Sequence, residues 1–133
     1  MLSLILFDVD DTLMDYKAAE SAVLRRIFAQ NGKEADPAAL EDLWGLSWHY
    51  WDLHQLSQTW REEVQREYHR RYHAAVLAYC AAMREKYALN MEADALYERF
   101  NAFMADAVTL YDDALPVLSA LQSRFTIGIA SNA

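Results

Sequence analysis

Three residues in the first tenth of this chain have the types and spacing of a catalytic site. They are Asp8, Asp10 and Thr12, which directly follow the apolar run at residues 4–7. Residues two apart in an extended chain point to the same side, so the carboxylates of Asp8 and Asp10 are expected to lie close together. Close carboxylates repel each other unless a cation compensates, and Mg²⁺ is typically bound by one or two carboxylates plus a substrate phosphate. The cluster therefore predicts a site for Mg²⁺ and a phosphate.

Two apolar runs are expected to position these polar residues. Residues 4–7 with Val9 predict a strand that is buried on both faces, as in a parallel sheet covered by helices. Residues 125–130 predict a second buried strand, which ends in Ser131 and Asn132. Ligands of open α/β sheets bind at the carboxyl ends of the strands, which is where the acidic cluster falls. The sequence thus predicts an α/β fold.

A purely structural interpretation of both clusters also exists. Asp favours turns and helix caps, so an acidic turn would simply end the first strand, with Asp15 capping the next helix. Ser131 and Asn132 are likewise common turn residues.

Residues 15–108 show helical periodicity, and nothing in them indicates a strand. We expect a first helix at about 16–30 that stops at Asn31-Gly32, a second that starts at Asp36-Pro37, a long third helix at about 57–87 and a fourth capped by Asn90. The inner face of the second helix is expected to carry Leu40, Leu43, Trp44, Ser47, Trp48 and Trp51. A short helix capped by Asp113 should precede the second strand.

The amino-acid composition limits the classes of partner that the chain is expected to bind. The chain has 133 residues and a net charge of -8, which opposes binding to a nucleic acid polymer or an anionic membrane but is compatible with a small phosphorylated metabolite. The apolar residues 1–7 are too short to span a membrane. Cys80 is the sole cysteine, so no intrachain disulfide can form, and we expect a cytoplasmic protein in which Cys80 is a small buried apolar residue.

The segment from Asp8 to Thr12 resembles the DxDxT first motif of the haloacid dehalogenase-like (HAD) hydrolases, and Ser131-Asn132 resembles their second motif. The resemblance implies a Rossmann-like parallel sheet, of which only the first two strands are present, with an inserted four-helix C1 cap. Residues 1–14 and 109–133 would form the partial core, and residues 15–108 would form the cap, acting as a lid over the site.

The resemblance also implies a role for each residue. Asp8 would be the nucleophile that forms an aspartyl-phosphate, and Asp10 the general acid and base. Mg²⁺ would bind the Asp8 carboxylate and the Asp10 main-chain carbonyl, while Ser131 and Asn132 would bind phosphate. True dehalogenases generally lack an Asp at the second position, so Asp10 favours phosphoryl transfer.

A narrower similarity concerns the substrate. The cap size and the first motif look most like the subgroup that contains pyrimidine 5'-nucleotidases of the YjjG type. Trp44, Trp48 and Trp51 share one helical face, and one of them would be available to stack on a base, although aromatic faces at this spacing more often belong to a core. Nucleoside 5'-monophosphates are therefore candidate substrates.

Two functions remain open at this stage. A HAD enzyme would continue beyond residue 133 with further strands, a catalytic lysine and an acidic pair, so we expect a fragment, a truncated product, or a chain whose core is completed by self-association or a partner. The first function is a Mg²⁺-dependent phosphatase. The alternative is a noncatalytic helical interaction protein that retains the start of a HAD core.

Overall fold

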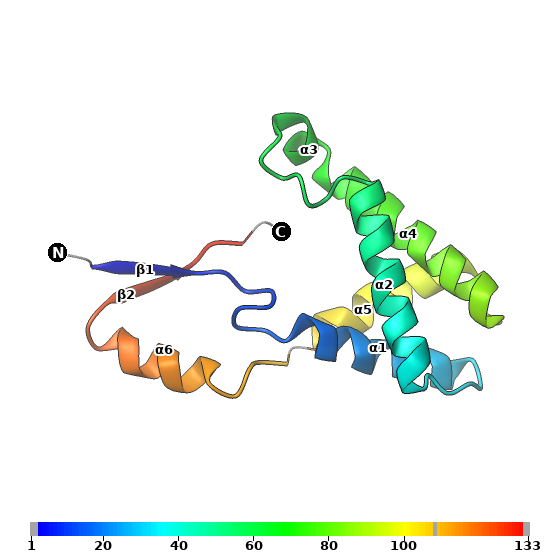
Figure 1. Cartoon of the computed structure of the whole chain (residues 1–133), viewed down its shortest axis with the longest axis horizontal. Coiled ribbons are helices and arrows are strands. Elements are labelled where there is room, and N and C mark those ends of the chain that lie inside the picture. The colour runs from blue at the N-terminus through cyan, green and yellow to red at the C-terminus, as the bar shows by residue number, and fades with distance from the viewer. Residues whose placement is uncertain (1–2, 108, 132–133) are drawn as a thin grey trace.

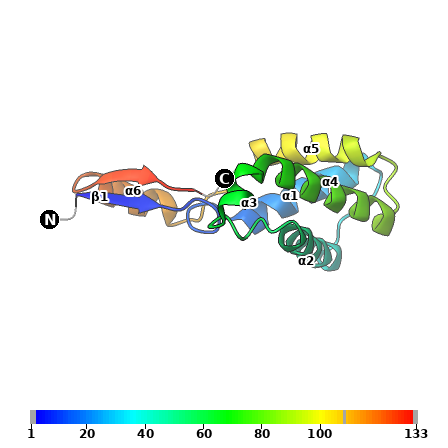
Figure 2. The same ribbon diagram turned by 90° about the horizontal axis from the view of Figure 1, so that it is seen from above.

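The computed structural model of this chain describes residues 3–107 and 109–131. A small α/β unit lies at one end of the molecule and a cluster of helices at the other (Figure 1), and the view from above shows the same separation (Figure 2). In chain order the elements are β1 (Leu4–Phe7), α1 (Tyr16–Gln30), α2 (Pro37–Leu53), α3 (Glu62–Arg66), α4 (Tyr68–Tyr87), α5 (Ala93–Asp106), α6 (Ala114–Gln122) and β2 (Thr126–Ile129).

The strands β1 and β2 pair in parallel, in a register that aligns Leu4 with Thr126 and Phe7 with Ile129. The helix α6 precedes β2 and packs against it. Gly128 fits this pairing because an added Cβ would lie 2.8 Å from Cδ2 of Leu6, closer than side chains tolerate. The expected α/β fold with a parallel pair of strands is therefore confirmed.

The expectation that both strand faces are buried is wrong for the described residues. Leu6 and Ile129 are 59% and 66% exposed, and Leu4 is also exposed. Within residues 3–107 and 109–131, α6 is the only helix that packs against the sheet. A two-stranded sheet with one short helix cannot cover the apolar side chains that the sequence places on both faces.

The main hydrophobic core lies among α1, α2, α4 and α5. Its members recur at helical spacing in the sequence, and Cys80 is one of them, as expected. The core comprises Val23, Leu24, Ile27, Phe28, Ala35, Leu40, Leu43, Val76, Tyr79, Cys80, Met83, Leu89, Leu96, Phe100 and Phe103.

The first helix begins and ends where the sequence predicts, and the second helix begins where the sequence predicts. Asp15 accepts a hydrogen bond from the backbone N–H of Ala18 at 2.9 Å, and Asp36 accepts one from Ala39 at 2.8 Å. Both are N-caps, and Pro37 opens α2. Gly32 adopts φ +68° just after α1, a conformation that suits glycine.

The long helix predicted at about 57–87 is interrupted. Its first part forms the loop at 54–61 and the short α3, and a bend at Glu67 separates α3 from α4. Burial of Leu56 and Val64 stabilises this path, and Arg71 donates hydrogen bonds to the His54 carbonyl and the Gln55 side chain. These are tertiary contacts, and no glycine or proline marks the break in the sequence.

The predicted cap of the fourth helix is also wrong, because α5 starts at Ala93 with Glu92 at the N-cap position. The preceding loop is held by two other side chains. The Asn31 side chain accepts a hydrogen bond from the Met91 N–H at 3.0 Å, and Arg84 donates to the Met91 carbonyl at 3.1 Å. These contacts keep the chain non-helical past Asn90.

Among the described residues, no helix combines the length and the apolar character needed to cross a bilayer.

Candidate functional site

The segment that follows β1 folds into a tight loop. The Val9 carbonyl accepts hydrogen bonds from the N–H groups of Thr12, Leu13 and Met14 at 3.2, 2.9 and 2.9 Å. Asp11 takes φ +59°, a conformation that short polar residues adopt more readily than others. The backbone alone thus fixes the position from which the acidic side chains project.

Asp8 and Asp10 lie in this loop with exposed side chains. The Thr12 hydroxyl donates a hydrogen bond of 3.2 Å to Oδ2 of Asp8. Partial desolvation raises the pKa of Asp10, and the charges of Asp8 and Asp11 raise it further. The two carboxyl groups of the predicted motif therefore differ in environment.

The second predicted motif emerges at the same edge of the sheet. The N–H of Ala130 donates to the Phe7 carbonyl at 2.9 Å, so the pairing of β1 with β2 extends to the residues that precede Asp8 and Ser131. Both side chains therefore follow the carboxyl ends of neighbouring parallel strands, where α/β proteins bind ligands. Asn132 lies outside the described residues.

The two chain segments that join the α/β unit to the helices run side by side. The Asp15 N–H donates to the Thr109 carbonyl at 2.7 Å, and the Tyr111 N–H donates to the Leu13 carbonyl at 3.0 Å. Met14 also forms an antiparallel bridge with Leu110. The helical part is thus attached right beside the acidic loop.

Two tyrosines of the helical part come close to Asp10. Burial raises the pKa of Tyr16, at the start of α1, and the charges of Glu20 and Asp10 add to the increase. Burial also raises the pKa of Tyr68, at the start of α4, with Asp10 again contributing. The charge of Asp10 thus acts on residues at the starts of α1 and α4.

An aromatic pocket opens in the helical part. Its volume is about 20 Å³, which is room for about one water molecule, and Tyr16 is among its lining residues. Five of the nine lining side chains are phenols or phenyl groups, and one is an indole. They are Tyr16, Ser47, Tyr50, Trp51, Tyr72, Ala75, Val76, Tyr79 and Phe100.

Glu20 is 1% exposed and is not among the residues that line this pocket. The Tyr79 hydroxyl donates a hydrogen bond of 3.3 Å to Oε1 of Glu20, whereas Oε2 is buried without a hydrogen-bond partner among the described residues. Burial raises the pKa of Glu20 to about 7, an increase that Tyr79 and the nearby Ser47 hydroxyl limit. A buried carboxyl is costly to stability when it is charged, which is why burial raises this pKa.

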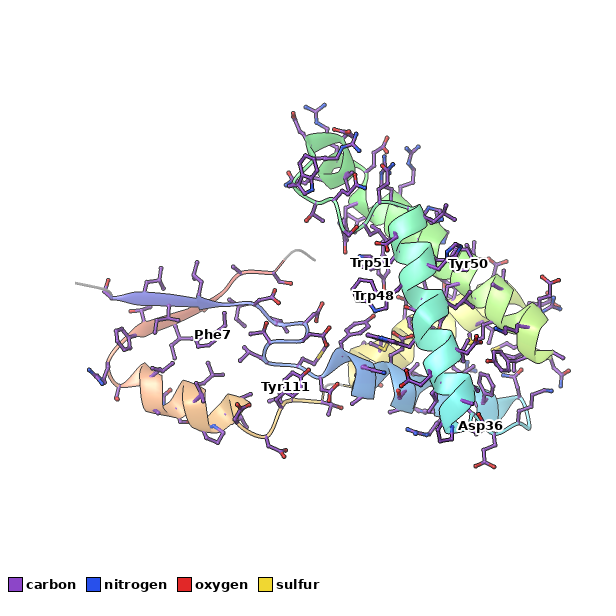
Figure 3. The ribbon with its side chains drawn as sticks, viewed as in Figure 1. Phe7, Asp36, Trp48, Tyr50, Trp51 and Tyr111 are labelled. Atoms are coloured by element: carbon purple, nitrogen blue, oxygen red, sulfur yellow. The ribbon has the colours of Figure 1, made fainter. Side chains whose placement is uncertain are left out.

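The three tryptophans of α2 do not lie in the core as expected. Trp48 is 45% exposed, and it packs edge-on against Trp44 with ring centroids 5.9 Å apart. Trp48 and Trp51 project from the side of α2 toward the strands, whereas Tyr50 lies on the opposite side (Figure 3). Trp44 and Trp51, which lie on the same side of α2 as Leu40, are half-buried.

The donor chemistry of the loop suits Mg²⁺, because hard carboxylate and carbonyl oxygens are its preferred ligands. The accumulated negative charge that raises the pKa of Asp10 would also be relieved by a cation. Within the described part of the chain, no three His, Cys, Asp or Glu side chains gather into a metal site. Asp8 and Asp10 thus offer part of a coordination shell.

The sequence-based prediction missed Tyr16, Glu20 and Tyr68. A signal existed for Glu20, because it precedes Val23, Leu24 and the later core residues of α1 at helical spacing and so falls on the apolar face. A glutamate on an apolar face predicts a buried acid. Nothing in the local sequence distinguishes Tyr16 or Tyr68 from ordinary half-buried tyrosines.

Comparison with known proteins identifies relatives along nearly the whole chain. The model of the haloacid dehalogenase-like hydrolase family matches residues 2–133. A Bacillus subtilis protein named as a HAD-hydrolase, YfnB, is 25% identical over 128 residues, which are 96% of this chain and 50% of YfnB.

Solved structures show the same fold. The magnesium-bound orthorhombic form of YfnB superposes with a TM-score of 0.73 at 23% identity, over 99% of this chain and 54% of that one. A structure described as a dehalogenase superposes with a TM-score of 0.60 at 21% identity, over 100% of this chain and 52% of that one. The chain therefore spans about half the length of the relatives it matches.

Proposed function

Because this chain belongs to the haloacid dehalogenase-like hydrolases, we propose that it supplies the nucleophile and the acid of a Mg²⁺-dependent phosphatase. The observation that carries the proposal is the loop after β1, in which Asp8 and Asp10 follow the carboxyl end of a parallel strand and the charge of Asp8 acts on Asp10. In the first step, a carboxylate oxygen of Asp8 bonds to phosphorus and the bond from phosphorus to the leaving oxygen breaks. The product is an aspartyl-phosphate and an alcohol.

Asp10 supplies the proton that the leaving oxygen needs. Partial burial and the charges of Asp8 and Asp11 raise the pKa of Asp10, a direction that suits an acid, while its neighbour Asp8 acts as the nucleophile. In the second step, water attacks phosphorus, Asp10 takes up the proton of that water, and phosphate leaves Asp8. The hydrogen bond from Thr12 keeps the Asp8 carboxylate in position.

The Asp8 carboxylate and the Asp10 carbonyl would hold the Mg²⁺ ion, and Ser131 and Asn132 would bind the phosphate. The ion neutralises charge on the phosphoryl group when bound. Residues 15–108 would act as the cap that excludes water, hinged where residues 13–15 meet 109–111. Magnesium binding by YfnB supports this assignment by analogy.

A small phosphorylated metabolite is the proposed substrate, and a nucleoside 5'-monophosphate is one candidate. Trp44, Trp48 and Trp51 would then supply stacking surfaces for a base. The exposure of Trp48 and the position of Trp51 in the pocket support this idea. The net charge of -8 and the single cysteine support action on small molecules in the cytoplasm.

Two other functions are weaker. A dehalogenase resembles the chain in fold, but that reaction releases halide and needs no acid at the position of Asp10. A noncatalytic interaction protein agrees with the exposed apolar strands, although it leaves the geometry of the acidic loop unexplained.

The decisive experiment is the replacement Asp8→Asn, tested with p-nitrophenyl phosphate and Mg²⁺ in this chain and in a longer version that carries the rest of a HAD core. The amide has the shape of the carboxylate but cannot attack phosphorus, so activity should fall by a factor on the order of a thousand or more. Circular dichroism should remain unchanged.

Asp11→Asn is the matched control. It removes a carboxylate from the same loop, and Asn tolerates the φ of +59° found there. It should retain most of the activity. Equal losses in Asp8→Asn and Asp11→Asn, or no activity in any version, would reject the nucleophile assignment.

A further inference from the structure

A buried carboxyl joins two helices in the interior of the helical part. Glu20, in the second turn of α1, is 1% exposed, and its Oε1 accepts a hydrogen bond of 3.3 Å from the hydroxyl of Tyr79 on α4. Its Oε2 is buried and has no hydrogen-bond partner within residues 3–107 and 109–131. A neutral carboxyl fits such a place far better than a carboxylate, because an ionised group that leaves water needs partners for both of its oxygens.

The groups that surround Glu20 offer hydroxyls but no compensating positive charge. Burial raises the pKa of Glu20 to about 7, and the hydroxyls of Tyr79 on α4 and Ser47 on α2 oppose that increase. Tyr16 of α1 and Tyr72 of α4 are further titratable groups on which the charge of Glu20 acts. In the part of the chain that the structure describes, no lysine or arginine contributes to the pKa of Glu20. Loss of its proton therefore leaves a poorly compensated charge in the interior.

Space for water lies beside these groups. The pocket of about 20 Å³, with room for about one water molecule, is lined by Tyr16, Ser47 and Tyr79, and each of these side chains also interacts with Glu20. From α5 the pocket receives Phe100, which is uncharged and meets the Tyr79 ring edge-on with centroids 5.7 Å apart. A small movement of Glu20 or Tyr79 would let water reach the carboxylate from this space.

The two halves of α1 differ in how firmly they are held. Residues 16–18, before the buried pair Ala19 and Glu20, are half-buried or exposed. The part of α1 after Glu20 is anchored in the main core by Val23, Leu24, Ile27 and Phe28. Opening of the first turns of α1 should therefore cost less free energy than unfolding of the whole helical part, as is usual for local openings at the ends of elements.

From this geometry we propose that Glu20 and Tyr79 form a proton-controlled latch between α1 and α4. While Glu20 is protonated, its side chain stays buried and the hydrogen bond from Tyr79 is intact. When Glu20 loses its proton, the carboxylate draws in water beside Tyr79, and the first half of α1 moves away from α4 while the main core stays folded. The latch is independent of the proposed phosphatase function, because no step of it involves Asp8 or the acidic loop.

Hydrogen–deuterium exchange of the full chain, resolved into peptides by mass spectrometry, tests the latch. Protection factors, which are corrected for the intrinsic rise of exchange with pH, are compared at about pH 6 and about pH 8 for peptides from the first half of α1 and from α5. The pKa of Glu20 is 4.5 when the group is exposed to water and about 7 when it is buried. Protection of the first half of α1 should therefore fall about tenfold between the two pH values. Protection of α5 should fall much less.

Two variants separate the latch from a general loosening of the fold. Glu20→Gln keeps an oxygen that accepts from Tyr79 but cannot ionise, so the protection of its α1 should be the same at both pH values. Tyr79→Phe removes a hydroxyl that lowers the pKa of Glu20, so its α1 should lose more protection than that of the wild type. Glu98→Gln, which replaces an exposed glutamate of α5, is the matched control and should behave as the wild type.

A measurement on the unaltered chain keeps the test decisive if a variant fails to fold. Carbon-13 NMR of the glutamate carboxyl groups should show one group that titrates with a pKa of about 7, whereas an ordinary glutamate titrates at about 4.3. The absence of such a group would overturn the proposal. The same would follow from an equal loss of α1 protection in the wild type and Glu20→Gln, or from an equal loss in α1 and α5 of the wild type.

Discussion

Acidic residues of the same chemical type lie in very different surroundings in this chain. Asp8 is exposed and receives a hydrogen bond from Thr12, whereas partial burial and then the charges of Asp8 and Asp11 raise the pKa of Asp10. Glu20 is 1% exposed and accepts a hydrogen bond from the Tyr79 hydroxyl. Differences of this kind are what separates a nucleophile from an acid in active sites.

Replacement of Asp10 should affect substrates according to their leaving groups. We expect Asp10→Asn to slow hydrolysis of ribose 5-phosphate about a hundredfold more than hydrolysis of p-nitrophenyl phosphate, because only the sugar alkoxide needs a proton as it departs. Steady-state kinetics on both substrates with Mg²⁺ measure the difference. Equal losses for the two substrates would remove the acid role from Asp10.

Glu20 should make stability depend on pH. Its pKa rises from 4.5 in the unfolded chain to about 7 in the folded one, so the folded state holds the proton longer. The contribution to stability is therefore complete below pH 4.5 and is lost as the pH rises through 7. The loss should approach about 3 kcal/mol.

Urea titrations of the wild type and Glu20→Gln across this pH range provide the measurement, with the exposed Glu34→Gln as control. Subtracting the Glu20→Gln curve isolates the glutamate from the other acids. A difference between the two curves that stays constant with pH would show that Glu20 titrates normally.

At the scale of single elements, local caps determine where some helices start and tertiary contacts determine where others start. The N-caps Asp15 and Asp36 set the starts of α1 and α2 through short-range hydrogen bonds. The starts of α4 and α5 depend instead on contacts between distant residues, such as Arg71 with His54 and Asn31 with Met91.

Loss of one cap should have a local and moderate effect. Asp36→Ala removes the acceptor for the Ala39 N–H and should lower the free energy of unfolding by about 1 kcal/mol. Chemical denaturation monitored by circular dichroism tests this, with Glu34→Ala as a nearby exposed control. A stability equal to that of the control would show that water replaces the cap without cost.

At the scale of the whole molecule, paired chain segments join two units that differ in how well they bury their apolar side chains. The helices enclose a continuous core, whereas the parallel strands expose Leu4, Leu6 and Ile129. Open strand edges and exposed apolar faces favour association with other chains.

We therefore expect this chain to self-associate through its sheet. Leu6→Lys introduces a charge on the exposed strand face and should shift the mass measured by light scattering toward the monomer, with unchanged helical circular dichroism. Leu53→Lys is the matched control, because Leu53 is 62% exposed at the end of α2, away from the sheet. An equal effect of both changes, or a monomeric wild type, would contradict the role of the sheet.

The sequence by itself determined the parts of this protein that depend on local signals. Apolar runs predicted both strands, and capping residues predicted the bounds of α1 and the start of α2. The spacing of Asp8, Asp10 and Thr12 predicted a carboxylate loop at a strand end, and the family assignment agrees with it. These features could be predicted because each is encoded within a few neighbouring residues.

Only the tertiary structure decided the features that join distant segments. The break between α3 and α4 depends on tertiary contacts. Leu56 and Val64 are buried there, and Arg71 donates a hydrogen bond to the His54 carbonyl. The pairing of Glu20 with Tyr79 spans 59 residues, and no local pattern specifies it. Trp48 was wrongly expected on the inner face of α2 for the same reason, since helical periodicity identifies an apolar face but not what covers it.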